Sequence, residues 1–112
     1  MNFNEDYCPL PLNEGYTEIL RLDKLLSEAG IPHTLRRIYD GWQVIYSVDE
    51  VRVADAVQHN FSYGASANLL EIMGLIMPDD DTCDTVKGWL TAENVFERMK
   101  NHYEAHLKRS EE

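Results

Sequence analysis

Residues 35–46 read LRRIYDGWQVIY and predict a β-hairpin. Asp40-Gly41 stands between two segments rich in β-branched and aromatic residues, and such a dipeptide is the strongest short-range signal for a hairpin turn. Pairing outward from this turn sets Tyr39 opposite Trp42, Arg37 opposite Val44, and Leu35 opposite Tyr46. Because side chains alternate along a strand, these six share one face. That face is largely apolar and aromatic, so we expect helices to cover it.

Two segments with helical periodicity flank the hairpin. The first covers residues 16–29, after which Gly30 suits a helix C-terminus and Pro32 prevents continuation. Its apolar stripe consists of Ile19, Leu22, Leu25, Leu26 and Ala29. The second covers Ala92–Lys108 and follows Thr91, a good N-cap residue.

Two further segments are predicted to extend the sheet. Residues 50–58 (EVRVADAVQ) favour a third strand over a short helix. Residues 69–77 (LLEIMGLIM) form a short apolar run whose periodicity does not separate a strand from a helix, although Gly74 favours a strand. After Pro78 an acidic, solvated loop is expected to reach about Gly88.

These elements predict one α+β domain over residues 15–112, preceded by an extended or flexible arm over residues 1–14. The expected architecture is a two-layer sandwich: a three- or four-stranded antiparallel sheet with an N-terminal and a C-terminal helix on one face. The opposite face is expected to be partly open, with Arg36, Ile38, Gln43 and Ile45. An open face in so small a protein often becomes a homodimer interface or a partner surface.

The strongest global feature is a formal net charge of −10 at pH 7. A field of this sign repels phosphate groups, so direct binding of nucleic acid is not expected, whereas a basic protein partner is favoured. The N-terminus lacks the regions of an export signal, and no apolar run has the length needed to cross a membrane. We therefore expect a cytoplasmic protein with Cys8 and Cys83 as reduced thiols.

The sequence contains no complete motif for catalysis or metal binding. His102 and His106 stand at i and i+4, but HYEAH differs from the HExxH metal motif. Residues 79–90 begin like a calcium loop, yet Cys83 and Leu90 occupy ligand positions. The chain also lacks GxSxG, a P-loop and GxGxxG. The sequence therefore predicts a non-enzymatic protein with no metal and no cofactor.

One group of side chains suits a ligand or the side chain of a partner. A guanidinium flanked by aromatic rings can stack on them and bind a carboxylate or phosphate. The polar and aromatic loop of residues 59–67 (HNFSYGASA) can bring further rings to the hairpin. The predicted binding residues are Arg37, Tyr39, Trp42, Tyr46, His59, Phe61 and Tyr63. The alternative is an arginine at the margin of an aromatic core, with its stem packed and its head in water.

The acidic run after Pro78 is the second candidate region. A cluster of carboxylates suits a basic partner surface, and the predicted contacts are Asp79, Asp80, Asp81 and Asp84. The alternative is a solvated loop that keeps the protein soluble.

Four segments of the chain are similar to sequences of a known group of proteins: residues 15–33 (GYTEILRLDKLLSEAGIPH), 40–46 (DGWQVIY), 61–75 (FSYG followed by LLEIMGL) and 88–104 (GWLTAENVFERMKNHYE). Together they resemble a group of small acidic proteins encoded by phages, prophages and mobile elements of Gram-positive gut bacteria. The resemblance implies a bacterial host cell as the setting and supplies no catalytic motif.

Charge, motifs and resemblance together predict a non-enzymatic protein that binds and inhibits a host protein. The expected mode is that of an anti-defence, anti-CRISPR-like inhibitor whose acidic surface covers a basic groove, such as that of a nucleic-acid enzyme. The alternative is a binding protein or sponge for a nucleotide-like ligand at the Arg37 pocket.

Overall fold

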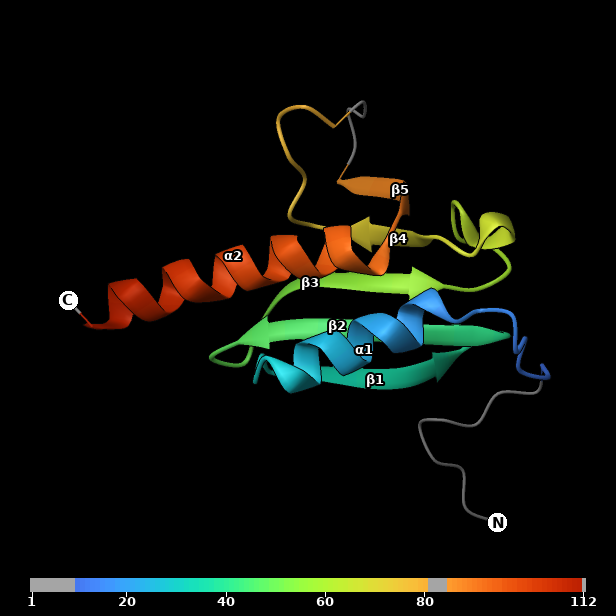
Figure 1. The fold of residues 1–112 in the computed structure, drawn as a ribbon, viewed down its shortest axis with the longest axis horizontal. Helices are drawn as coiled ribbons and strands as arrows, with labels where there is room; N and C mark the ends of the chain where they lie inside the picture. The colour runs from blue at the N-terminus through green and yellow to red at the C-terminus, as the bar shows by residue number, and fades with distance from the viewer. Residues whose placement is uncertain (1–9, 81–84, 112) are drawn as a thin grey trace, which may run out of the picture.

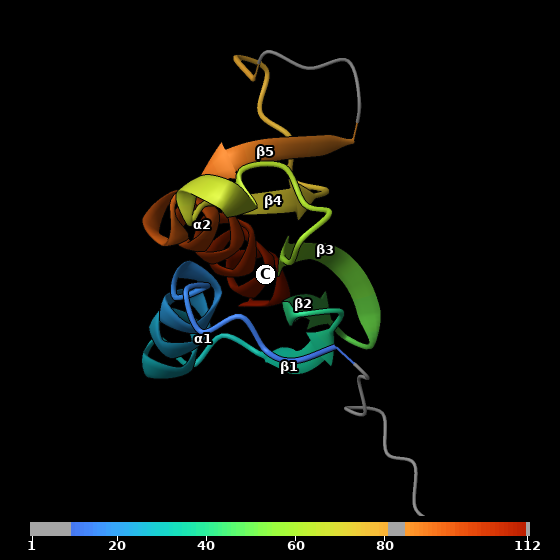
Figure 2. The same cartoon turned by 90° about the vertical axis from the view of Figure 1, so that its right-hand side faces the viewer.

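The computed structural model describes residues 10–80 and 85–111 and shows a two-layer α+β fold. The elements are α1 (Glu18–Glu28), β1 (His33–Ile38), β2 (Gly41–Val48), β3 (Val51–Gln58), the 3-10 turn η1 (Ala65–Ala67), β4 (Leu70–Met73), β5 (Val86–Leu90) and α2 (Ala92–Glu111). The strands form one antiparallel sheet in the order β1-β2-β3-β4-β5 (Figure 1). Both helices lie on the same face of this sheet (Figure 2), as predicted.

The sheet has five strands rather than the predicted three or four. The additional strand is β5, which falls largely in the segment predicted as a loop up to about Gly88. Its sequence VKGWL is short and interrupted by a glycine, so local β propensity is weak and pairing with β4 determines its conformation. Residues 69–77, ambiguous in the sequence, contain β4.

The β1–β2 hairpin forms, but its register is displaced by two residues from the predicted one. The observed pairs include Ile38–Gly41, Arg37–Trp42, Leu35–Val44 and His33–Tyr46. The turn is therefore centred on Tyr39 and Asp40, and the predicted pairing of Tyr39 with Trp42 is wrong. Because a displacement by two residues preserves side-chain alternation, the rest of the predicted face is retained.

Gly41 is required for a close approach between strands rather than for the turn. A Cβ atom at this position would stand 1.8 Å from the carbonyl oxygen of Gln58. The positive φ of the turn belongs instead to Tyr39, at +52°. The Asp-Gly signal thus identified the hairpin correctly and its geometry incorrectly.

The core lies between the helices and the sheet. Its fully buried side chains include Ile19, Leu22 and Leu26 of α1, Val44, Tyr46, Leu70 and Ile72 of the strands, and Val95 and Met99 of α2. On β3 the residues opposite Tyr46 and Val44 are Ala54 and Ala56. These small side chains leave room for the Tyr46 ring beneath the helices.

Antiparallel pairing brings five chain segments to one end of the molecule. They are the β1–β2 turn, the β3–β4 loop, the end of β5 and the N-termini of both helices (Figure 1). Asn68 in the loop joins them, since its Oδ1 accepts hydrogen bonds from the backbone N–H of Thr17 (3.0 Å) and Glu18 (3.3 Å). Oε1 of the buried Gln58 accepts from the N–H of Ile19 (3.1 Å). Side chains distant in sequence therefore satisfy the first amides of α1.

We expect Asn68→Ala to lower the free energy of unfolding by about 2 kcal/mol. The variant removes the acceptor of two backbone amides and of the Gln58 side-chain amide, and it places alanine at a φ of +56°, which asparagine tolerates better. Urea denaturation measures the change. The matched control is Asn60→Ala in the same loop, because Asn60 is exposed. Equal effects of the two variants would contradict the capping role.

The face away from the helices carries a ladder of polar side chains at its centre. Gln43 and Asp55 are 5% and 7% exposed there. Nε of Arg36 donates to Oε1 of Gln43, and Nε2 of Gln43 donates to Oδ2 of Asp55, both at 2.7 Å. Arg52 pairs with the same Asp55 oxygen at 3.2 Å. The prediction of a partly open face is confirmed for Arg36, Ile38 and Ile45, which are half-buried, whereas Gln43 is buried.

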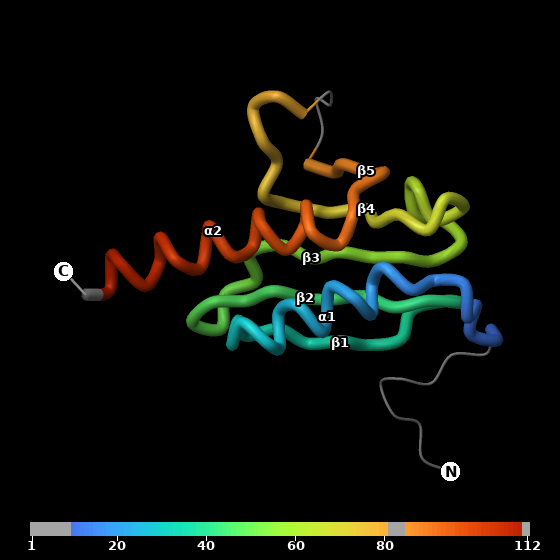
Figure 3. The backbone as a smooth tube through the Cα atoms, in the orientation of Figure 1, coloured from blue at the N-terminus to red at the C-terminus, as the bar shows by residue number. Residues whose placement is uncertain are grey.

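The second helix begins at its predicted residue and ends later than predicted. The Oγ1 of Thr91 accepts a hydrogen bond from the N–H of Asn94 (3.1 Å), which confirms the N-cap. The helix continues to Glu111 instead of Lys108. Its C-terminal turns project past the sheet (Figure 3), and Leu107 on them is 44% exposed.

Candidate functional site

Aromatic side chains are exposed at the end of the molecule where the loops meet. The exposed fractions are 70% for Phe61, 65% for Tyr63, 59% for Trp89 and 45% for Tyr39. The Tyr39 ring meets those of Phe61 and His59 edge-on, at centroid distances of 5.2 and 5.0 Å. The backbone N–H of Trp89 donates to the carbonyl of Tyr63 (3.4 Å). We call the exposed Tyr39, Phe61, Tyr63 and Trp89, together with the buried His59 that contacts Tyr39, the aromatic surface. A group of exposed apolar side chains marks an interaction site.

The loop that carries three of these side chains is held by its own amides. Every backbone N–H from residue 59 to 63 donates a hydrogen bond. The acceptors are Ser62 Oγ for His59, Asp40 Oδ1 for Asn60, His59 Nδ1 for Phe61, the His59 carbonyl for Ser62 and Glu71 Oε1 for Tyr63, at 2.8–3.0 Å. The loop therefore presents exposed rings from a fixed backbone.

His59 supports the loop in its neutral form. The residue is 9% exposed, and burial lowers the pKa of its imidazole, although Glu71 and Asp40 act in the opposite direction. Its Nδ1 accepts the hydrogen bond from the N–H of Phe61, so this nitrogen carries no proton. His59 is therefore a positioning residue for the Phe61 ring.

Trp89 joins the surface through a β-bulge that the sequence analysis missed. The register between β4 and β5 shifts where Gly88 and Trp89 stand opposite Glu71. Trp89 has a φ of +61°, an uncommon conformation for a bulky residue that costs about 1–2 kcal/mol. Gly88 permits this arrangement, because a Cβ atom there would lie 2.3 Å from the Cβ of Tyr63. The glycine next to the tryptophan was the available sequence signal.

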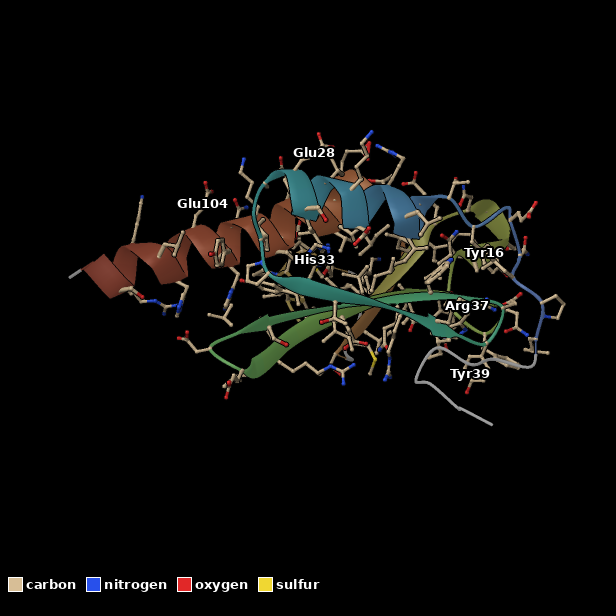
Figure 4. The ribbon with its side chains drawn as sticks, turned by 90° about the horizontal axis from the view of Figure 1, so that it is seen from below. Tyr16, Glu28, His33, Arg37, Tyr39 and Glu104 are labelled. Atoms are coloured by element: carbon tan, nitrogen blue, oxygen red, sulfur yellow. The ribbon has the colours of Figure 1, made fainter. Side chains whose placement is uncertain are left out.

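The structure divides the predicted ligand pocket into three parts. Tyr39, His59, Phe61 and Tyr63 lie on the aromatic surface. The Arg37 guanidinium lies 5.6 Å from the centroid of the Trp42 ring, and its Nη2 donates to the carbonyls of Leu10 (3.1 Å) and Tyr39 (3.2 Å). Arg37 thus connects the hairpin turn to the described part of the N-terminal arm, and Figure 4 shows it at the same end as Tyr39 and Tyr16.

Tyr46 lies in the core and takes no part in the surface. Its side chain is fully buried, and its hydroxyl is 2.8 Å from Nδ1 of His102. Burial raises the pKa of Tyr46 to about 12. The prediction that Tyr46 contributes to binding therefore does not agree with its position, because the helices cover the face that carries it.

The predicted acidic contacts have different environments. Asp79 is exposed, whereas Asp80 forms a bidentate ion pair with Arg98 (2.8 and 2.9 Å) in which both side chains are 8% exposed. Asp81 and Asp84 lie outside the described residues, as do Cys8 and Cys83. Asp79 is thus available to a partner, and Asp80 is engaged within the chain.

The Asp80–Arg98 pair predicts a loss of stability in acid. Hydrogen bonds from Arg98 lower the pKa of Asp80 to about 2, from an ordinary value of 3.8. A lowered pKa means that the folded state favours the carboxylate, so the stabilisation is present above the ordinary value and is lost as the pH falls toward about 2. Asp80→Asn should cost about 2 kcal/mol at neutral pH.

Urea denaturation of the wild type and Asp80→Asn at a series of pH values tests this prediction. The difference between the two proteins should shrink steadily below the ordinary carboxylate pKa. Asp79→Asn is the control, because its exposed side chain should give almost no difference at any pH. A difference that persists unchanged in acid would contradict the ion-pair explanation.

A serine, a histidine and an acid lie close together on α1 and β1 but do not form a catalytic relay. Ser27 Oγ and Asp23 Oδ1 both face Nε2 of His33, at 3.4 and 2.7 Å. Nδ1 of His33 faces the carbonyl of Ile31 at 2.8 Å. A relay places the acid and the nucleophile on opposite ring nitrogens, so this arrangement secures β1 to α1.

The helical histidine pair also has separate partners. His102 faces Tyr46, whereas Nε2 of His106 lies 3.3 Å from Oδ2 of Asp49. Within residues 10–80 and 85–111, no group of three or more His, Cys, Asp or Glu side chains is placed to hold a metal ion. In that same part of the chain, no helix is long and apolar enough to cross a membrane.

Comparisons of the chain with protein-family models, with curated proteins and with solved structures gave no match.

Proposed function

We propose that this protein is a non-enzymatic inhibitor that binds a host protein with a basic surface and uses the aromatic surface as its anchor. One observation carries the proposal: exposed aromatic side chains stand on a hydrogen-bonded backbone at one end of a strongly acidic molecule. Isolated exposed rings are ordinary, but Phe61, Tyr63 and Trp89 are gathered on structures that fix their backbone.

The aromatic side chains supply the expected affinity. Tyrosine and tryptophan are enriched among the few interface residues that dominate binding energy. Because the amides of residues 59–63 are already hydrogen-bonded, docking orders little additional backbone. The free protein already bears the cost of the positive φ at Trp89. Because such strain is found at functional positions, it favours a binding role for the exposed Trp89 ring.

The excess negative charge supplies attraction and selectivity. Two arginines of the described chain are neutralised internally: Arg21 pairs with Glu18 and Glu93, and Arg98 pairs with Asp80. The exposed acids include Glu14, Glu28, Glu50, Asp79, Glu97 and Glu104. A field of this sign speeds association with a basic surface and discourages nucleic acid.

The proposed setting is a bacterial cytoplasm in which a mobile element confronts host defence. A nucleic-acid enzyme is the proposed class of target, because its substrate groove is basic and an acidic protein can occupy it. Inhibition then follows from competition with nucleic acid, and no catalytic group is needed.

Capture from a Gram-positive host lysate, followed by mass spectrometry, tests the proposal. The bait is the tagged protein at low and at high salt, beside the double variant Phe61→Ser/Trp89→Ser and the control Leu107→Ser. A target is accepted only if it is retained by the wild type and the control, lost at high salt, and lost from the double variant. Equal capture by all three proteins would reject the aromatic surface as the anchor.

A second candidate function, binding of a nucleotide-like ligand, is favoured by two polar atoms beside the hairpin. Nε of Arg37 and Nε1 of Trp42 are buried and have no hydrogen-bond partner among the described residues. Two such donors suit an oxygen-rich ligand. A thermal shift assay against a nucleotide panel tests this candidate, since a tight ligand must raise the unfolding midpoint. No shift with any nucleotide would reject it.

A further inference from the structure

A cavity of about 640 Å³ lies between residues 75–80 and α2. None of the residues of the aromatic surface lines it. Its apolar lining is provided by Leu75, Ile76, Met77 and Leu90. The apolar wall suits an aliphatic group of several carbon atoms, and the volume leaves ample room for one.

An ion pair builds one wall of this cavity and fixes its shape. Arg98 on α2 donates to both carboxylate oxygens of Asp80, to the carbonyl of Leu75 (3.1 Å) and to Oδ1 of Asn94 (2.8 Å). Asp80 also accepts from the N–H of Met77 (2.8 Å). The segment is therefore pinned to the helix, and the guanidinium is already committed. Among the described lining residues, no unpaired lysine or arginine is present to bind an anionic ligand.

The charge that remains in the cavity is negative. Asp79 and Glu97 line it and are both exposed. His102 also lines it, and its Nδ1 faces the Tyr46 hydroxyl. Burial, followed by the charges of Arg109 and His106, lowers the pKa of His102 and favours its neutral form. Among the described residues that line the cavity, Arg98 is the only lysine or arginine and is paired with Asp80, whereas Asp79 and Glu97 add two further carboxylates. This balance of charge selects a positively charged group.

We propose that this cavity receives a lysine or arginine side chain of the basic partner. The aliphatic stem lies against Leu75, Met77 and Leu90, and the charged head faces Glu97 and Asp79. Such a side chain carries both properties of the cavity, an apolar body and a single positive charge. The choice of a protein partner rests on the proposed function, whereas the choice of a cationic, aliphatic group rests on the cavity alone.

NMR titration of the full chain with n-butylguanidinium chloride tests the proposal. The neutral probe n-butylurea has nearly the same shape without the charge. We expect amide shifts confined to residues 75–80 and 94–102, with a dissociation constant of the order of 10 mM. Butylurea should bind at least about threefold more weakly.

The decisive variant is Glu97→Gln, with Glu104→Gln as its control. Both residues are exposed glutamates of α2, but only Glu97 lines the cavity. Figure 4 places Glu104 near the projecting end of the helix. Glu97→Gln should weaken butylguanidinium binding about two- to fivefold, and Glu104→Gln should leave it unchanged.

Three results would overturn the proposal: no localised shifts, equal binding of butylurea, or equal effects of the two glutamine variants. The last would mean that the probe responds to overall charge. Failure of the probe leaves lysate capture through the aromatic surface untouched. Conversely, probe binding without a captured target would reject the proposed function and retain the cation site.

Discussion

Gly41→Ala is expected to lower the free energy of unfolding by about 3–4 kcal/mol, the largest stability effect that we predict. The added methyl group would stand 1.8 Å from the carbonyl oxygen of Gln58 and 2.8 Å from its carbonyl carbon. These are backbone atoms of a paired strand, so no side-chain rotation relieves the clash. The end of β3 must move, and Gln58, which caps α1, moves with it.

Gly30→Ala provides the matched control. Gly30 has a φ of +70°, but no atom lies within 4 Å of an added Cβ atom. This variant therefore isolates backbone strain, which costs about 1 kcal/mol, whereas Gly41→Ala isolates steric contact. Urea denaturation of both variants gives the comparison. A cost for Gly41→Ala no greater than that for Gly30→Ala would show that β3 can withdraw from β2 easily.

Gly41 also shows which features of the hairpin a local sequence pattern can predict. The Asp-Gly pair correctly predicted two strands and, through side-chain alternation, most of the buried face. The register depends on which residue adopts the positive φ and on what approaches Gly41 from β3. The local pattern indicates neither of these features, and the contact with Gln58 depends on the tertiary structure. The predicted pairing was therefore displaced by two residues.

The helices were predictable because their signals are local. The Thr91 cap lies within one turn, and the apolar stripe of α1 recurs at helical spacing within one continuous segment. β5 was not predictable in this way, because its partner strand supplies most of its stabilisation.

The candidate site was predictable only where its residues are close in sequence. Residues 59–63 form one loop, and the neighbouring hairpin turn adds Tyr39. Trp89 reaches the same surface through the β4–β5 bulge, which no local pattern indicates. Arg37 of β1 and Tyr46 of β2 share a face of the sheet, yet Tyr46 contacts His102 of α2 and Arg37 contacts Leu10 of the N-terminal arm.

Trp89→Asn and Phe61→Ala are each expected to weaken binding of the captured partner at least about 30-fold. Both residues present more than half of their surface to solvent in the free protein, 59% and 70%. Their large effect on binding should accompany a small effect on stability. For Trp89, asparagine tolerates the positive φ better, and this relief offsets part of the lost ring contact.

Binding of the purified partner by calorimetry, together with urea denaturation of each variant, measures both quantities. Leu107→Ala is the control, since Leu107 is an exposed apolar residue on the projecting part of α2. It should leave affinity within about twofold of the wild type. Variants that lose affinity only in proportion to lost stability would assign the rings a structural role. Because hydrogen bonds of the loop amides hold the backbone of Phe61, affinity should instead fall while the fold persists.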